Sequence, residues 1–328
     1  MSRWRSILLL AALCFALFSV RGCSPPPEPL RLGHIHWPGY EPLTLADELG
    51  YFGATSVQVL HFSSGTQLKR AFRNRVVELA AVSLLEAMDL ARLDPEVRIL
   101  LALDYSAGAD VILGQPGINT VADLRGRRVG YEFGGIGAYL LSRALELNHI
   151  PLQEVQAVNV ENDRQEELFH SDTRGIDAVV TFEPYRSRLL AAGATTLFSS
   201  SSIPNEILDV LVVREPVLRR RPDALVSVIQ GWFRALEHIR SQPADSSQRL
   251  AAYLGLNATE ILSVYSGLRL AGPVENRQIL LGPGATIVLR TQDSAEILRQ
   301  SGSPGWDLDA HTLPATAPLT LALQRTMP

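Results

Sequence analysis

The sequence predicts an α/β fold of two lobes, each a mainly parallel sheet flanked by helices. Three observations predict it. Short apolar segments alternate with amphipathic ones from residue 30 onward, which is typical of βαβ units. The alternation pauses near residue 108 and then starts again. With 328 residues, 46% of them apolar, the chain is long enough for two domains and apolar enough to give each a core.

The first lobe begins with three strand–helix pairs and a further strand. Strands are expected where apolar and β-branched residues run together between turn residues, at 30–37, 56–62, 78–83 and 97–106. Helices are expected where apolar residues recur at helical spacing, at 43–52, 67–77 and 84–93. Gly50 lies where the first helix should end, and the loop 63–66 (SSGT) leads into the second helix.

The second lobe repeats the pattern by the same criteria. Strands are expected at 109–114, 128–133, 155–160, 175–182, 194–200 and 209–215. Helices are expected at 118–127 with Thr120 as N-cap, at 134–148, around 164–170 and from Pro184. The remainder is mostly helical, at 223–241, 246–255, 257–269 and 294–302. Because 109–114 and 209–215 are interpreted as crossover strands, lobe one is expected at 30–108 plus 212–328, and lobe two at 109–211.

The N-terminus has the pattern of an export signal. Arg3 and Arg5 precede a stretch at 7–20 that is apolar apart from Ser19 and too short to span a bilayer comfortably. The following "VRGC" resembles a bacterial lipobox, although Arg21 departs from it. The resemblance implies a signal peptide at 1–22, lipidation of Cys23, a Pro-rich tether at 23–29, and a periplasmic or cell-surface location. Simple secretion is the alternative.

Composition and motifs exclude several classes of function. The net charge of −4 argues against nucleic-acid binding, and after signal removal only Cys23 remains of the two cysteines. Metalloprotease, hydrolase-elbow and phosphate-loop motifs are absent, and a dinucleotide fingerprint would need glycine where Leu140 stands. His34 and His36 share one face of a strand but have no clustered ligands in sequence. We therefore expect no cofactor, no metal and no enzymatic activity.

Five segments carry a resemblance to a known family. They are WPGYEPLTLADELGYF, SVQVLHFSSGTQLKRAFRNRVVELAAVSLLEA, INTVADLRGRRVGYEFGGIGAYLLSRALE, GIDAVVTFEPYRSRLLAAG and ILDVLVVRE. Together they resemble substrate-binding proteins of ABC importers in the nitrate/sulfonate/taurine and thiamine-pyrimidine (NMT1-like) group. The resemblance implies a two-lobed periplasmic-binding-protein fold of type II, a small-molecule ligand, an ABC permease as partner and a monomeric protein. It implies ligand contacts from the loops that follow strands: Trp37, Tyr40, Ser64, Thr66, Ser83, Asp104, Gly134, Gly135, Gly137, Glu183, Tyr185 and Asp209.

The expected cleft is acidic and aromatic. Glu132 joins Asp104, Glu183 and Asp209 at predicted strand ends, and few basic residues occupy matching positions. Carboxylates repel an anion, whereas carboxylates with aromatic rings suit an organic cation or an aminated heterocycle such as a pyrimidine. The alternative is a sulfonate or nitrate held at the helix start 134–137, with the acids joining the lobes. A sensing lipoprotein with a membrane signalling partner, and an enzyme on the same fold, are further alternatives.

Overall fold

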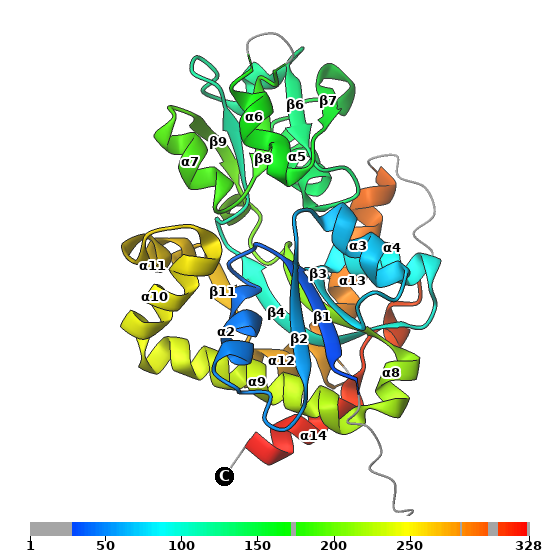
Figure 1. Ribbon diagram of the computed structural model, residues 1–328. Coiled ribbons are helices and arrows are strands. Elements are labelled where there is room, and N and C mark those ends of the chain that lie inside the picture. Colours follow the sequence, from blue (N-terminus) through cyan, green and yellow to red (C-terminus); the bar gives the residue numbers. More distant parts are fainter. Residues whose placement is uncertain (1–27, 172–174, 283, 301–307, 327–328) are drawn as a thin grey trace, which may run out of the picture.

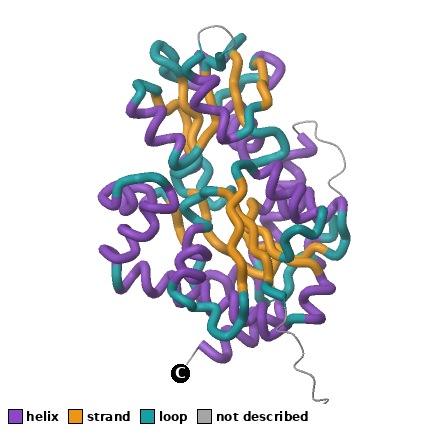
Figure 2. The backbone as a smooth tube through the Cα atoms, in the orientation of Figure 1, coloured by secondary structure: helices purple, strands orange, loops and turns teal. Residues whose placement is uncertain are grey.

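The computed structural model describes residues 28–171, 175–282, 284–300 and 308–326. Its strands form two separate sheets, one above the other in Figure 1, with helices on the outside of both (Figure 2). The expected signal peptide, Cys23 and most of the tether lie outside the described residues. Across the described ranges, no helix combines the length and the apolar character needed to cross a membrane.

The larger sheet has the strand order β11-β4-β10-β3-β1-β2. Its strands are β1 (Leu30–Ile35), β2 (Val57–Phe62), β3 (Leu79–Ser83), β4 (Val97–Ser106), β10 (Leu208–Arg214) and β11 (Leu268–Leu270). The helices around it are α2 (Glu41–Glu48), α3 (Gly65–Arg73), α4 (Leu84–Leu93), α8 (Glu215–Arg220), α9 (Pro222–Ser241), α10 (Pro243–Leu254), α11 (Ala258–Ser266), α12 (Pro273–Leu280), α13 (Thr286–Gln300) and α14 (Thr316–Thr326), with the 3₁₀ turn η5 (Ala310–Thr312).

The smaller sheet has the strand order β7-β6-β8-β5-β9. Its strands are β5 (Val111–Gly114), β6 (Arg128–Tyr131), β7 (Gln156–Asn159), β8 (Ala178–Thr181) and β9 (Thr195–Ser199). Its helices are α5 (Ile136–Leu147), α6 (Gln165–Phe169) and α7 (Tyr185–Ala191), with the 3₁₀ turns η1 (Val121–Leu124), η2 (Leu152–Glu154), η3 (Asn162–Arg164) and η4 (Ser200–Ser202).

Both sheets are mixed, and the strands next to the lobe crossings are the reason. Parallel pairs link β1 to β2 and β3, and β6 to β7 and β8. In contrast, β10 runs antiparallel to β3 and β4, and β5 runs antiparallel to β8 and β9. The lobe boundary expected at 211/212 falls inside β10, which pairs in the larger sheet from Leu208 onward. We therefore propose the boundary just before β10.

Two local expectations were wrong. The segment 118–127 forms only the 3₁₀ turn η1, because the Asp123 carboxylate accepts the backbone N–H groups of Asn119 and Thr120 and so closes a turn. The segment 257–269 ends as strand β11, in which Leu268 pairs with Ser106 at the edge of β4. In both cases a capping side chain or a distant strand outweighed local helical periodicity.

Candidate functional site between the two sheets

A pocket lies between the lobes, at the carboxyl ends of β1, β3, β6 and β8. It encloses about 580 Å³, part of which is open to solvent. Its lining is Ile35, Trp37, Tyr40, Gly65, Ser83, Glu86, Asp110, Glu132, Gly135, Ile136, Gly137, Asn162, Val180, Thr181, Phe182, Ile207 and Asp209. Both lobes supply residues, and strand ends beside a crossover are where open α/β sheets place their ligands.

Seven residues predicted from sequence line this pocket, and six do not. The seven are Trp37, Tyr40, Ser83, Glu132, Gly135, Gly137 and Asp209. The six that lie outside the lining are Ser64, Thr66, Asp104, Gly134, Glu183 and Tyr185. Most of the six support a lining residue or join the lobes. That any of the thirteen contacts a ligand stays a prediction.

The carboxylate of Glu183 forms its hydrogen bonds with the helix that follows it. Its carboxylate accepts the backbone N–H of Ser187 at 3.1 Å and the Ser187 hydroxyl at 2.9 Å, so it caps the first turn of α7. Tyr185 is half-buried behind the lining, and its ring meets that of Phe182 edge-to-face, with centroids 6.0 Å apart. Neither residue lines the pocket, and Tyr185 supports it only through its contact with Phe182.

Aromatic side chains from the two lobes meet in the pocket. The rings of Trp37 and Phe182 pack edge-to-face, with centroids 5.2 Å apart and planes at 84°. Trp37 donates its indole N–H to Asp104 at 3.3 Å, which fixes the ring from below. Asp104 therefore contacts the lining residue Trp37 but does not line the pocket itself. Tyr40 adds a third ring, 6.4 Å from that of Trp37.

Three buried aspartates lie beneath the aromatic rings. Asp104 and Asp209 are register partners on the neighbouring strands β4 and β10, and the Tyr40 side chain lies near Asp209. Burial raises the pKa of Asp104 to about 8 and that of Asp110 to about 7. Burial and the charges of Asp104 and Asp110 hold the pKa of Asp209 well above its ordinary value. At neutral pH this cluster therefore retains protons.

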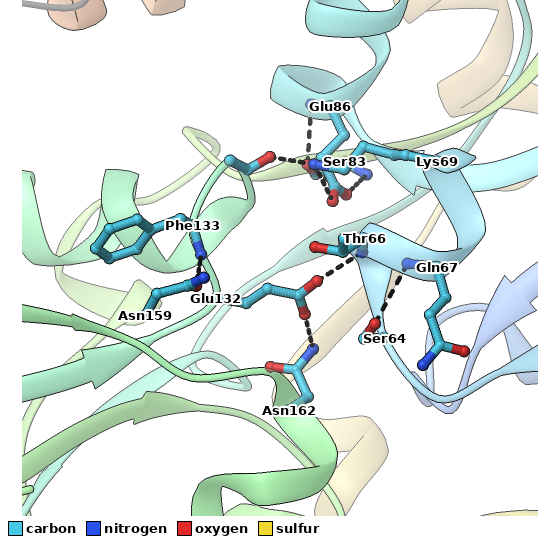
Figure 3. Close-up of polar contacts among 11 residues, drawn as sticks. Ser64, Thr66, Gln67, Lys69, Ser83, Glu86, Glu132, Phe133, Asn159 and Asn162 are labelled. Carbon is cyan, nitrogen blue, oxygen red and sulfur yellow. Dashed lines mark hydrogen bonds and ion pairs between the residues drawn. The ribbon is translucent and has the colours of Figure 1, made fainter. Parts of the chain in front are cut away.

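Glu132 extends from the smaller lobe to the start of α3. Ser64 is the N-cap of this helix and accepts the N–H of Gln67, and the next free donor, the N–H of Thr66, reaches the Glu132 carboxylate at 2.6 Å. Asn162 donates to the other carboxylate oxygen at 2.8 Å, as Figure 3 shows. An internal carboxylate thus occupies the helix start that an anionic ligand would otherwise use. Burial nevertheless raises the pKa of Glu132, against these hydrogen bonds.

Lys69 and Glu86 form a second link between the lobes. Lys69 donates to the carbonyl of Gly134 in the smaller lobe and lies 3.4 Å from the Glu86 carboxylate (Figure 3). Glu86 in turn accepts the backbone N–H and the hydroxyl of Ser83, which closes the capping box of α4. Gly134 has φ of +74°, a conformation that favours glycine. The ammonium group of Lys69 therefore contacts Gly134 and Glu86, and Lys69 does not line the pocket.

The start of α5 offers donors without a side-chain cap. Gly135 is its N-cap and makes no side-chain cap bond, and Gly135, Ile136 and Gly137 all line the pocket. A Cβ on Gly137 would lie 2.9 Å from Cβ of Tyr131, so this position requires close approach. At the start of α3, Glu132 accepts a backbone N–H, and at the start of α4, Glu86 does so. The start of α5, by contrast, lines the pocket.

Sequence reasoning missed several lining residues. Asp110 precedes a crossover strand, where no motif marks it, and Glu86 lies in the first turn of α4, where it reads only as a capping-box partner. Phe182 and Asn162 follow strands of the smaller lobe. The rule that residues after strand ends line the cleft, applied to every strand, would have found Phe182 and Asn162. Asp110 and Glu86 had no such signal.

Comparison with known proteins identifies the family. The NMT1-like family model matches residues 24–255. The chain belongs to the NMT1-like family. A relative in Escherichia coli (strain K12), named as an aliphatic sulfonates-binding protein, is 24% identical over 267 residues, covering 79% of this chain and 82% of the relative.

Solved structures of other binding proteins have the same fold as this NMT1-like chain. The alkanesulfonate-binding protein of Xanthomonas axonopodis pv. citri, bound to MOPS, superposes with a TM-score of 0.75 at 17% identity, covering 88% of this chain and 99% of that one. The periplasmic nitrate-binding protein of Synechocystis PCC 6803 gives 0.74 at 12% identity, covering 92% and 90%. The predicted periplasmic-binding-protein fold is confirmed.

Proposed function

We propose that the protein is the solute-binding component of an ABC importer, which closes its two lobes around a small organic molecule and delivers it to a membrane permease. The observation that carries this is the pocket, which both lobes line and which lies at the strand ends. Membership of the NMT1-like family supports it, as does the name of the Escherichia coli relative.

Contacts between the lobes supply the energy of closure. Two charge-assisted hydrogen bonds cross the cleft. The N–H of Thr66 donates to Glu132, and the hydroxyl of Ser64 donates to Glu161 at 2.9 Å. Lys69 adds a third link through the Gly134 carbonyl. A ligand that fills the pocket shifts the equilibrium toward this closed form by its contacts with both lobes. The permease would then distinguish the closed form from the open one.

The ligand we favour is an organic cation or an aminated heterocycle such as a pyrimidine. The pocket lining contains four carboxyl groups, of Glu86, Asp110, Glu132 and Asp209, and no lysine or arginine. The carboxyls that are ionised attract a cation, and the protonated Asp110 and Asp209 can still accept hydrogen bonds from amino groups through their carbonyl oxygens. The rings of Trp37 and Phe182 provide faces or edges for stacking.

An anion is the second candidate, and two observations favour it. The start of α5 directs uncapped backbone donors into the pocket, and the buried aspartates hold protons at neutral pH. The relatives named above include proteins for sulfonates and nitrate. In this case the pocket acids donate rather than accept hydrogen bonds, and anion affinity falls as rising pH ionises them.

The protein would act outside the cytoplasmic membrane, anchored through lipid on Cys23. The lipobox-like sequence supports this anchor. We also propose that the protein is a monomer. A membrane signalling protein in place of the permease would use the same closure. Metabolic labelling with a fatty-acid analogue tests the anchor: the wild-type chain should incorporate label, Cys23→Ser should not, and label in the variant would exclude this site.

Native mass spectrometry of the freshly purified protein tests the proposed function. A small molecule bound at one per chain, amine-bearing and released on denaturation, is the expected result. A bound sulfonate or other anion would keep the receptor function and transfer the ligand's charge to the α5 start. If neither class of solute copurifies or shifts the thermal midpoint in a screen, the receptor function is wrong.

A further inference from the structure

A cluster of imidazoles and one carboxylate lies beside β1, and none of its residues lines the pocket. The cluster contains three histidines and one glutamate. They are His34 on β1, His36 just after it, Glu41 at the start of α2 and His61 on β2, and these elements lie side by side in Figure 1. The donor atoms of His34, Glu41 and His61 all lie within 4.8 Å of one another. We propose that this cluster binds a divalent transition metal of the zinc class.

The Glu41 carboxylate is the strongest observation. It is fully buried, and neither of its oxygens has a hydrogen-bond partner. Its oxygens lie 3.6 Å from Nδ1 of His36 and 3.7 Å from Nε2 of His61, too far for hydrogen bonds. A buried carboxylate loses its hydration and needs a compensating partner, and the two imidazoles within ion-pair distance supply this only when they are protonated. A cation between these atoms would supply what the carboxylate lacks.

His34 is oriented as a metal ligand. Its Nδ1 lies 2.8 Å from the carbonyl oxygen of Ile35, so Nδ1 carries the proton and Nε2 presents its lone pair. That Nε2 lies 2.9 Å from the hydroxyl of Thr44, and Nε2 of His61 approaches the same hydroxyl at 3.3 Å. Both Nε2 atoms thus point toward the Thr44 hydroxyl, so a metal ion bound by these imidazoles and Glu41 would replace their contacts with Thr44.

The distances suit a small tetrahedral ion after a modest contraction. Zinc–nitrogen and zinc–oxygen bonds near 2.0–2.1 Å place tetrahedral ligands about 3.3 Å apart. The separations of 3.6 and 3.7 Å are close to this value, and the widest, 4.8 Å, needs about 1 Å or more of side-chain movement. Imidazole and carboxylate donors without a thiolate suit zinc, and also nickel or copper.

The exposed members of the cluster give the ion a route of entry. The side chains of His36 and His61 are 43% and 27% exposed, whereas those of Glu41 and His34 are buried. His36 stacks on His61 with ring centroids 4.8 Å apart, so a small rotation would make it the fourth ligand. The alternative to metal binding is an imidazolium beside Glu41, which would hold the carboxylate without any ion.

This site is separate from the solute pocket but shares a loop with it. His36 and Glu41 flank the segment whose Trp37 and Tyr40 line the pocket. A bound ion would therefore fix both ends of that segment. The inference does not depend on the identity of the solute, and solute binding measured in the same preparations tests the two proposals separately.

Competition between the untagged protein and a chromophoric chelator for zinc tests the site. We expect one zinc per wild-type chain, and at least about ten-fold weaker binding for His61→Gln and for Glu41→Gln. His311→Gln, at an exposed residue of η5, is the matched control and should bind as the wild type does.

X-ray absorption of the zinc-loaded wild type keeps the test independent of how well a variant folds. A shell of nitrogen and oxygen near 2.0 Å with imidazole scattering is expected. The proposal is overturned if the wild type binds no zinc at stoichiometric concentrations, if sulfur is found in the shell, or if the folded His61→Gln variant binds zinc with wild-type affinity.

Discussion

Replacing Asp110 by asparagine should change how the stability of the protein depends on pH. Asp110 is 3% exposed, and burial raises its pKa from 3.8 to about 7 against an opposing hydrogen bond with Ser106. Asp104 and Asp209 are the other ionisable groups of the cluster. Between about pH 4 and 7 the folded protein holds a proton that the unfolded chain has lost. The free energy of unfolding therefore falls as the pH rises through this window.

The magnitude follows from the two pKa values. Each pH unit in this window removes about 1.4 kcal/mol from the free energy of unfolding, so the loss from about pH 4.5 to pH 8 is about 3 kcal/mol. The asparagine variant has no such proton to lose. The difference in unfolding free energy, variant minus wild type, should therefore increase by about 3 kcal/mol over this range.

Urea unfolding of both proteins at about pH 4.5, 6 and 8 measures the difference. Asp123→Asn is a control whose difference from wild type should stay nearly constant at these three pH values, because hydrogen bonds from Asn119 and Thr120 lower the pKa of this exposed carboxyl and both of its pKa values lie below the assayed range. The stability that Asp123 contributes is present above its unfolded pKa and is lost on acidification. A constant difference between Asp110→Asn and wild type at all three pH values would refute the buried-acid account.

Three further predictions concern the pocket and its closure. Glu161→Ala removes the acceptor of the Ser64 hydroxyl across the cleft, so calorimetry should show up to about ten-fold weaker binding of the solute. The thermal midpoint without solute should stay near that of the wild type. Unchanged affinity would exclude this contact from closure. Trp37→Phe should abolish most of the fluorescence change on solute binding, because Trp37 lines the pocket and Trp232 is buried in the core of the larger lobe. Trp306→Phe, at a position outside the described residues, is the control and should keep the change; a change of wild-type size in Trp37→Phe would place the reporter elsewhere. Glu183→Gln should lower stability by about 1 kcal/mol through the cap of α7 and leave affinity within about two-fold; a ten-fold loss of affinity would mean that Glu183 contacts the solute.

Much of the fold was predictable because its signals are local. Apolar runs such as Leu79–Ser83 and amphipathic runs such as Gly65–Arg73 each indicate their own structure, and their alternation predicts the sheets. The direction of β10 depends instead on the chain returning from the other lobe. The short β11 exists only because it pairs with β4. Such elements are decided by tertiary contacts, which a sequence pattern does not contain.

The candidate site was half predictable for a similar reason. Trp37, Ser83 and Gly137 follow strand ends, and that rule finds them. Whether a carboxylate in the right region faces the solute or the protein depends on its rotamer and neighbours. Glu183 bonds to its own helix for this reason, while Asp110 faces the pocket.

The cluster of His34, His36, Glu41 and His61 shows the same limit more clearly. His34 and His36 alternate along a strand and suggest a shared face from sequence alone. Glu41 and His61 complete the cluster only when α2 and β2 pack beside β1. No sequence spacing relates these four positions to one another.

We expect the acidic pocket between the lobes to hold the solute. Calorimetric affinity for the copurified solute at about pH 6 and pH 8.5 tests it most directly, for a solute whose own charge is constant over this range. Ionisation of Asp110, with its pKa of about 7, should strengthen binding of a cationic or aminated solute about ten-fold at the higher pH. Affinity that falls with rising pH would contradict the claim and assign the ligand's charge to the start of α5.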